Sequence, residues 1–194
     1  VSLVGSEMCI RDRLNDMLNL SKLESGKMEF LMQQGDLVDI IQRATEELET
    51  LITDRELKVI VEATDLDTVT YFDAEKMLQV MINLLSNAIK FTPKGKQITI
   101  FFDPHTSAQP QSLKLQTNLL TIVVDDQGIG IPEGEEGAIF DKFIQSSKTN
   151  TGAGGTGLGL SIVKEIVQAH HGYVAAFANA HGGARFRLSL PVIS

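Results

Sequence analysis

A long amphipathic segment near the middle of the chain constrains the fold more than any other feature. Asp73 is a typical helix N-cap residue, and the helical pattern that follows it runs to about Lys90. Apolar residues recur at helical spacing along one side of this segment: Met77, Leu78, Met81, Ile82, Leu85 and Ile89. The pattern predicts a helix whose apolar side is buried against the rest of the domain.

Shorter elements are predicted on both sides of this helix. A second amphipathic helix is expected over residues 36–52, and its apolar side comprises Leu37, Ile40, Ile41, Ala44, Leu48 and Leu51. Strands are predicted at 58–62, 68–72, 97–102 and 119–124. The remaining predictions are a loop at 103–117, a helix at 160–169, and a closing hairpin of 173–177 with 184–190. Because helices and short strands are mixed, an α+β fold, a two-layer α/β sandwich, is favoured over a bundle.

The composition is that of an ordinary globular protein, with 43% hydrophobic and 22% charged residues among 194. No apolar run approaches the ~20 residues that a membrane span needs. The formal net charge of −8 excludes nucleic acid as the expected partner, because phosphate backbones are bound by clustered Lys and Arg. A single cysteine, Cys9, fits a reducing cytosol. The four histidines lack the spacing of metal ligands, so a structural zinc site is not expected.

The start of the chain differs from the rest. Residues 1–13 show neither a helical nor a strand period and join abruptly to a patterned segment, so they are interpreted as a non-native leader. The alternative is a native extension of the next helix. In that helix Leu14, Met17 and Leu18 share one face, and Gly26 is a plausible stop. A helix this short is marginal alone, and we expect it to pack on a partner helix outside this chain.

Polar residues form a row along the long helix. Asn83, Asn87 and Lys90 fall within one narrow sector at ~100° per residue. Two carboxamides in a helix interior are unusual, since asparagine is a poor helix former. A carboxamide oxygen suits magnesium, and a lysine can contact phosphate oxygens. The alternative interpretation is an ordinary solvated face.

An acid followed by alternating glycines comes directly after the strand at 119–124. Asp126 can accept a hydrogen bond from an amino group such as that of adenine, and Gly128 and Gly130 allow a ligand to approach the backbone closely. A simple tight turn is the alternative. Asp125 lies one place off this pattern and is interpreted as an ordinary surface acid.

A second glycine-rich stretch, residues 152–161, opens the helix at 160–169. Backbone N–H groups at a helix N-terminus favour phosphate. The GK[ST] ending of a Walker loop is absent, and the glycine spacing is not that of a Rossmann fingerprint. A flexible linker is disfavoured by Leu158 and Leu160, which suggest packing. The segment between the two glycine-rich stretches is interpreted as a mobile lid with a hydrophobic latch, or alternatively Phe140 and Phe143 are core residues.

These motifs, in this order and spacing, resemble the sensor histidine kinases of two-component systems. Residues 79–92 resemble the N box of that family, 126–130 its first glycine box, 139–143 its F box and 155–160 its second glycine box. Residues 182–186 resemble its last strand. The resemblance covers roughly residues 14–192 and implies the Bergerat-type ATP-binding sandwich, with ATP and magnesium as cofactors.

The resemblance also implies roles for particular residues. Asp126 would bind the adenine amino group, Asn87 would hold magnesium, Asn83 would support the phosphates, Lys90 would contact phosphate, and Phe91 would line the adenine or ribose side. The remaining residues of the implied nucleotide site are Gly128, Gly130, Ile131, Phe143, Gly155, Thr156, Gly157, Leu158, Gly159 and Leu160.

Two departures from the family pattern limit what this chain is expected to do. Residues 14–27 resemble the end of the second dimerisation helix, but the phosphoacceptor histidine motif of the first is absent, so self-phosphorylation is not expected. Gln145 stands where many relatives have an arginine. Lys142 and Lys148 are both candidates for the catalytic charge that helps the γ-phosphoryl group leave, and the sequence does not choose between them.

The family also implies partners and a location. These are the dimerisation and phosphoacceptor domain of the same kinase, a response regulator or receiver domain, and a homodimeric parent. That parent would be anchored in the bacterial inner membrane or coupled to a sensory domain, with this part in the cytoplasm. We expect residues 14–30 to end the dimerisation helix and residues 31–194 to form the ATP-binding domain.

Two other functions are weighed against the kinase. ATP-hydrolysing switches of the gyrase or chaperone kind place a general-base glutamate four residues before the metal-binding asparagine. Here that position is Asn83, and a carboxamide cannot take a proton from water near neutral pH. A nucleotide-binding adaptor or anti-sigma-type kinase is disfavoured by the helix remnant at 14–27. Transfer of phosphoryl to a protein histidine is therefore favoured.

Overall fold

The main sheet of this computed structural model is mixed. The structure describes residues 28–104, 118–144, 146–147 and 157–192. Five strands lie in the order β2-β4-β5-β7-β6, and only β2 and β4 run parallel. Their bounds are β2 Lys58–Val61, β4 Gln97–Phe102, β5 Leu119–Asp126, β6 Tyr173–Ala178 and β7 Ala184–Pro191. β6 and β7 form the predicted hairpin.

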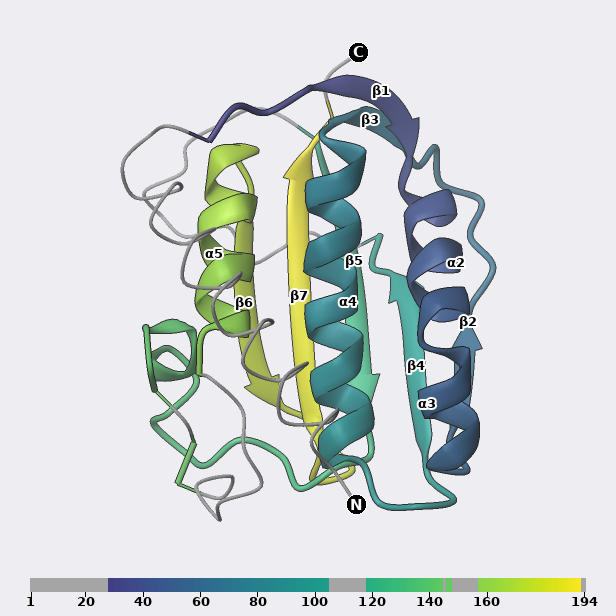
Figure 1. Cartoon of the computed structure of the whole chain (residues 1–194), viewed down its shortest axis with the longest axis vertical. Helices are drawn as coiled ribbons and strands as arrows, with labels where there is room; N and C mark the ends of the chain where they lie inside the picture. Colours follow the sequence, from purple (N-terminus) through teal and green to yellow (C-terminus); the bar gives the residue numbers. More distant parts are fainter. Residues whose placement is uncertain (1–27, 105–117, 145, 148–156, 193–194) are drawn as a thin grey trace, which may run out of the picture.

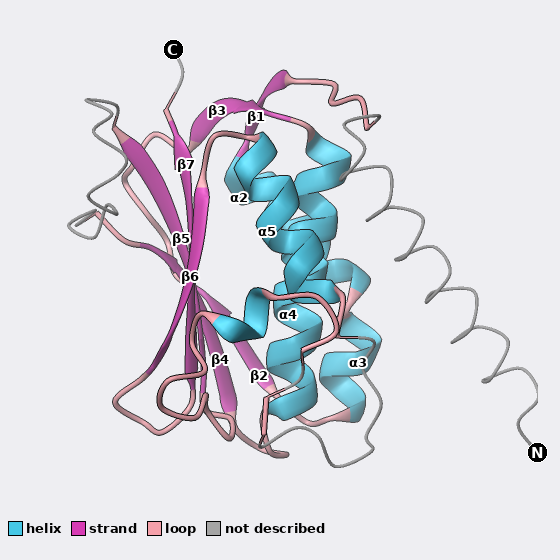
Figure 2. Ribbon diagram, turned by 90° about the vertical axis from the view of Figure 1, so that its left-hand side faces the viewer, coloured by secondary structure: helices cyan, strands magenta, loops and turns pink. Residues whose placement is uncertain are grey.

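Helices cover one face of this sheet, so the predicted two-layer α/β sandwich is confirmed (Figure 2). The helices are α2 Leu37–Glu47, α3 Glu49–Asp54, α4 Ala74–Phe91 and α5 Gly159–Ala169, and a 3₁₀ turn, η1, spans Ala138–Phe140. Helix α4 lies between α2 and α5 (Figure 1). In the part of the chain that the structure describes, no helix is long and apolar enough to cross a membrane.

Helix α4 follows its sequence pattern closely. The Asp73 carboxylate caps it by accepting a hydrogen bond from the Lys76 N–H at 3.0 Å. The predicted apolar stripe is buried except for Ile82, which is half-buried. Val80, Leu84 and Ala88 are buried as well. The buried surface is wider than one stripe because α2, α5 and the sheet contact this helix from different sides.

The predicted helix at 36–52 is wrong as one element. It breaks at Leu48, whose backbone (φ −98°, ψ 3°) separates α2 from α3. After this break Ile52 packs against the core, and Leu51 is 39% exposed instead of lying on the buried side. The four predicted core positions within α2 are buried. The periodicity therefore predicted the helical conformation, but packing decided where the helix bends.

A second, two-stranded sheet lies at one end of the sandwich (Figure 1). It pairs β1 Gln33–Asp36 with β3 Val69–Phe72 in antiparallel register. Strand β3 was predicted, but β1 was not, because its residues Gln-Gln-Gly-Asp carry no apolar alternation. The predicted helix at 14–27, the leader at 1–13 and most of the loop at 103–117 lie outside the described residues.

A buried histidine joins the start of α4 to the end of α5. The Nε2 atom of His170 accepts a hydrogen bond from the Asp73 N–H at 3.0 Å, and its Nδ1 lies 2.8 Å from the Ile166 carbonyl oxygen. A carbonyl can only accept, so Nδ1 carries the proton and the ring is neutral. The Phe30 ring packs edge-on against it. Burial is the main cause that lowers the pKa of His170 below its usual range.

This histidine is expected to make the fold sensitive to acid. The folded state lowers the pKa of His170, so its contribution to the unfolding free energy is complete above about pH 6.5, the usual pKa of histidine. This contribution is lost as the pH falls, because the unfolded chain takes up the proton first. We predict that His170→Gln flattens the decline in unfolding free energy between pH 7.5 and 5, measured by urea titration. The exposed neighbour provides the control: His171→Gln should keep the wild-type decline, and an identical decline in both variants would contradict the assignment.

Candidate nucleotide site

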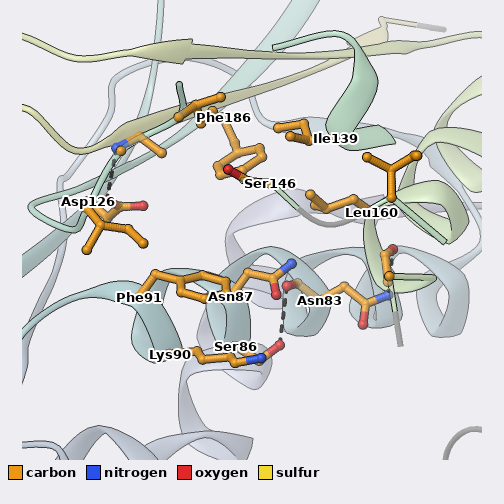
Figure 3. Close-up of a pocket in the computed structure, with 17 residues that line it drawn as sticks. Asn83, Ser86, Asn87, Lys90, Phe91, Asp126, Ile139, Ser146, Leu160 and Phe186 are labelled. Atoms are coloured by element: carbon orange, nitrogen blue, oxygen red, sulfur yellow. Dashed lines mark hydrogen bonds between the residues drawn. The ribbon is translucent and has the colours of Figure 1, made fainter. Parts of the chain in front are cut away.

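The site is a pocket between α4, the end of β5 and the start of α5 (Figure 3). Ten of the residues predicted for the site line it: Asn83, Asn87, Lys90, Phe91, Asp126, Gly130, Ile131, Gly157, Gly159 and Leu160. They come from separate parts of the chain, so the tertiary structure brings together the predicted N box and both glycine-rich stretches.

The polar row of α4 forms one wall of this pocket. Asn83, Asn87 and Lys90 all lie on the wall, so the polar row faces a pocket. The Asn83 Nδ2 atom donates to the Gly159 carbonyl oxygen at 3.4 Å, which links α4 to the first residue of α5. The Lys90 Nζ atom lies 5.0 Å from the centre of the Phe91 ring. This wall therefore presents carboxamides, one cation and one aromatic ring.

Asp126 is the last residue of β5 rather than a loop residue after it, which corrects the predicted strand end at 124. It is only 4% exposed. Its Oδ1 atom accepts from the Gly128 N–H at 2.8 Å and the Ala184 N–H at 3.0 Å. Figure 3 shows the other oxygen turned toward the pocket. Burial raises the pKa of Asp126, although these two N–H groups oppose the shift.

Seven wall residues were not among those predicted: Ser86, Ile129, Ile139, Ile144, Ser146, Ala184 and Phe186. Five of the seven are apolar, and Figure 3 shows two of these, Ile139 and Phe186, opposite the polar row. The position of Ser86, between Asn83 and Asn87, was an available signal. Phe186 comes from β7 and gave no local signal for the pocket. A site with one apolar wall and one polar wall suits a ligand with an aromatic ring and a charged end.

The second glycine-rich stretch is divided by the structure. Gly157, Gly159 and Leu160 line the pocket, whereas Leu158 is a buried core residue away from its wall. Leu158, the N-cap residue of α5, makes no capping hydrogen bond with its side chain. Gly128 also lies off the wall, and its contribution is the N–H that holds Asp126. Gly155, Thr156 and Lys148 lie outside the described residues.

The alternative that both F-box phenylalanines are core residues holds for Phe140 and is wrong for Phe143. Phe140 is buried and packs edge-on against Phe186. Phe143 is 62% exposed, outside the pocket wall, and in a left-handed backbone conformation (φ 62°). Its N–H donates to the Gly157 carbonyl oxygen, which directs the backbone rather than the ring toward the glycine stretch. Lys142 is half-buried and also lies off the wall.

Asp125 is not an ordinary surface acid. Its carboxylate forms an ion pair with Arg185 at 2.7 Å and accepts a hydrogen bond from Asn179 at the same distance. Hydrogen bonding by Asp125 is the main cause that raises the pKa of Arg185. The acid that precedes Asp126 is therefore part of the structure behind the pocket.

Two glycines with a left-handed backbone, Gly130 in the first glycine-rich stretch and Gly134 just after it, differ in how closely they are packed. A Cβ atom on Gly130 (φ 70°) would lie 2.3 Å from the Gly182 carbonyl oxygen, whereas one on Gly134 (φ 84°) would meet nothing within 4 Å. We predict that Gly130→Ala lowers the unfolding free energy by about 2–4 kcal/mol and Gly134→Ala by about 1 kcal/mol. Urea unfolding measures both, and equal losses would contradict the predicted overlap.

Comparison with known proteins identifies the domain. Residues 72–194 match the family described as histidine kinase-, DNA gyrase B-, and HSP90-like ATPase. The chain belongs to this family. It is 36% identical to hybrid signal transduction histidine kinase D of Dictyostelium discoideum and 34% identical to sensor histidine kinase WalK of Bacillus subtilis. Each match covers 92% of the present chain. It spans 11% and 28% of those relatives. This ATPase-family domain is thus homologous to the catalytic part of histidine kinases.

Solved structures agree with this family membership. The catalytic domain of histidine kinase ThkA matches with a TM-score of 0.67 and 26% identity, covering 84% of this chain and 97% of that domain. Full-length ShkA in complex with AMPPNP matches with a TM-score of 0.78, covering 98% of this chain and 37% of that one. At 20% identity the likeness to ShkA shows the fold alone.

Proposed function

We propose that this domain binds ATP with magnesium in the α4–β5–α5 pocket and transfers the γ-phosphoryl group to a histidine of a separate dimerisation domain. The observation that carries the proposal is the polarity of the pocket. A buried carboxylate, Asp126, lies at one end, and the carboxamides of α4 face the start of α5 at the other. This arrangement provides an acceptor for a base amino group and backbone donors for phosphates.

The proposed roles follow the position of each group. The free oxygen of Asp126 would accept the adenine amino hydrogen, and Phe91 and Ile131 would contact the base or ribose. Lys90 would contact phosphate, and the backbone from Gly155 to Leu160 would hold the triphosphate with the α5 dipole. Correct placement of the phosphates, rather than covalent chemistry, would account for most of the catalysis.

Asn87 is proposed as the protein ligand of magnesium. Magnesium usually takes one or two protein oxygens and completes its shell with phosphates and water, so a single neutral carboxamide fits an ion that arrives with the nucleotide. When bound, magnesium would neutralise charge on the phosphates. Asn83 would support the phosphates through its hydrogen bond to Gly159, which positions the start of α5.

The identity of residue 83 favours phosphoryl transfer to protein over hydrolysis. A gyrase-type or chaperone-type ATPase needs a base at this position on the pocket wall. The Asn83 carboxamide instead donates to Gly159 and cannot take a proton from water near neutral pH. An attacking imidazole supplied by another domain needs no such base. Lys142 and Lys148 remain the candidates for the charge that assists departure of the γ-phosphoryl group.

The partners follow from the kinase proposal. The phosphoacceptor histidine would lie in the dimerisation domain of the same parent protein, with residues 14–30 as the end of its second helix. Residues 1–13 would be a non-native leader that is not part of that domain. The parent would be a homodimer that passes phosphate to a response regulator or receiver domain. The domain would work in the cytoplasm, with its parent anchored in the inner membrane or coupled to a sensory domain.

The test combines binding with phosphoryl transfer. Calorimetry measures ATP binding with and without magnesium, and labelled ATP is then supplied with a separately prepared dimerisation domain that contains the histidine. We expect magnesium-dependent binding and label on that histidine. Steady phosphate release without labelled histidine would favour the hydrolytic switch, and absence of binding would reject both functions.

A further inference from the structure

One asparagine side chain builds the turn between β6 and β7. The Oδ1 atom of Asn179 accepts hydrogen bonds from the His181 N–H at 3.0 Å and the Gly183 N–H at 2.9 Å. The backbone of Asn179 closes the same turn, because its N–H donates to the Gly183 carbonyl oxygen and its carbonyl oxygen accepts from the Gly182 N–H. Asn179 therefore holds the turn through both its side chain and its backbone.

The same side chain attaches the turn to β5. The Asn179 Nδ2 atom donates to the Asp126 carbonyl oxygen and to the Asp125 Oδ1 atom, both at 2.7 Å, and lies 3.3 Å from the Ala184 carbonyl oxygen. Arg185 pairs with the same Asp125 carboxylate, so the negative charge beside the amide is balanced. Asn179 itself does not line the pocket.

The β6–β7 turn contacts Asp126, the residue proposed to bind adenine. A Cβ atom on Gly183 would lie 1.9 Å from the Asp126 carbonyl oxygen, so the two backbones are in close contact. The next residue, Ala184, donates its N–H to the Asp126 Oδ1 atom. Because this bond holds one carboxylate oxygen, the other remains directed into the pocket (Figure 3).

We infer that Asn179 is a positioning residue for base recognition: it fixes the β6–β7 turn so that the Ala184 N–H orients the Asp126 carboxylate. The inference rests on the proposed function, which assigns the adenine amino group to Asp126. The role needs a short planar side chain that donates and accepts at once. An aspartate would lose the donor and place a second charge beside Asp125, and a serine offers too few groups for both sides.

Nucleotide discrimination tests this role in the full chain. Calorimetry with magnesium compares ATP and GTP for wild type, Asn179→Ala and the isosteric Asn179→Asp. We expect ATP affinity to fall about tenfold in both variants, with GTP affinity unchanged, because only the base contact loses its orientation. A merely structural role would lower both affinities together or neither. Asp67→Ala is the control, because it removes a side-chain bond to the Val69 N–H in an exposed turn elsewhere.

Amide chemical shifts give a second measurement. In wild type the Gly128 and Ala184 N–H signals should both follow the titration of Asp126, since both bond its Oδ1 atom. In the Asn179 variants the Ala184 signal should stop following it, while Gly128 continues. An Ala184 signal that still titrates, together with an unchanged ratio of ATP to GTP affinity, overturns the inference.

Asp126→Asn separates this inference from the function on which it rests. If Asp126→Asn removes the preference for ATP and the Asn179 variants keep it, only the positioning role fails. If Asp126→Asn leaves the preference intact, the adenine assignment fails and the inference fails with it.

Discussion

Replacing Asn87 by aspartate is expected to abolish productive magnesium–ATP binding. A carboxylate on this wall would face the triphosphate, and like charges a few ångströms apart at the protein surface repel by several kcal/mol. It would also pair with Lys90, three residues along the same helix, and remove that ammonium group from the phosphates. We predict at least a ~100-fold loss of affinity in calorimetry with magnesium and ATP.

A second substitution on α4 controls for the added charge. Gln79→Glu makes the same carboxamide-to-carboxylate change two turns earlier, outside the pocket wall, and should leave ATP affinity unchanged. Wild-type affinity in Asn87→Asp would reject the assignment of this helix face to the phosphates and magnesium.

Replacing Asp126 by asparagine is expected to remove the preference for adenine. The two backbone N–H groups would still find an acceptor in the amide oxygen, so the amide nitrogen would be turned into the pocket. A donor would then face the adenine amino group, also a donor, whereas the corresponding oxygen of guanine could accept from it. We predict an ATP affinity about 10- to 100-fold lower, with GTP affinity unchanged or higher, in competition binding.

A distant acid provides the matched control. Asp103→Asn removes an ion pair with Arg187 on the sheet, away from the pocket, and should preserve discrimination. Acid should act in the same direction as the Asp126 substitution. Protonation of Asp126 by acid should weaken adenine binding. Because burial raises the pKa of Asp126, the folded chain takes up this proton before the unfolded chain as the pH falls, so protonation of Asp126 stabilises the fold. Retained discrimination of ATP over GTP in Asp126→Asn would contradict the proposal.

Local signals predicted some elements well. Helix α4 was predicted because its cap, its apolar period and its polar row all lie within one stretch of chain. Strand β1 could not be predicted in the same way, since three polar residues and a glycine become a strand only by pairing with β3. The break at Leu48 was equally hidden, because it depends on which side of the helix the core contacts.

The candidate site shows the same division. Asn83, Asn87 and Asp126 stood out because carboxamides in a helix and an acid before glycines are unusual choices for structure alone. The apolar character of Phe143 does not reveal the left-handed backbone that exposes its ring, and its role in the nucleotide site stays a prediction. Phe186 and Asn179 were missed because their importance comes from strand pairing between β5, β6 and β7.

The sequence by itself determined the elements that carry the chemistry and, through their order and spacing, the family to which the domain belongs. Residue type and helical period are local properties, and they specify which side of α4 can bind a ligand. Only the tertiary structure decided which residues form the rest of the pocket wall and how the Asp126 carboxylate is oriented. The groups that hold its carboxylate are backbone N–H groups of Gly128 and Ala184, and every residue type other than proline has such a group, so no sequence pattern distinguishes them.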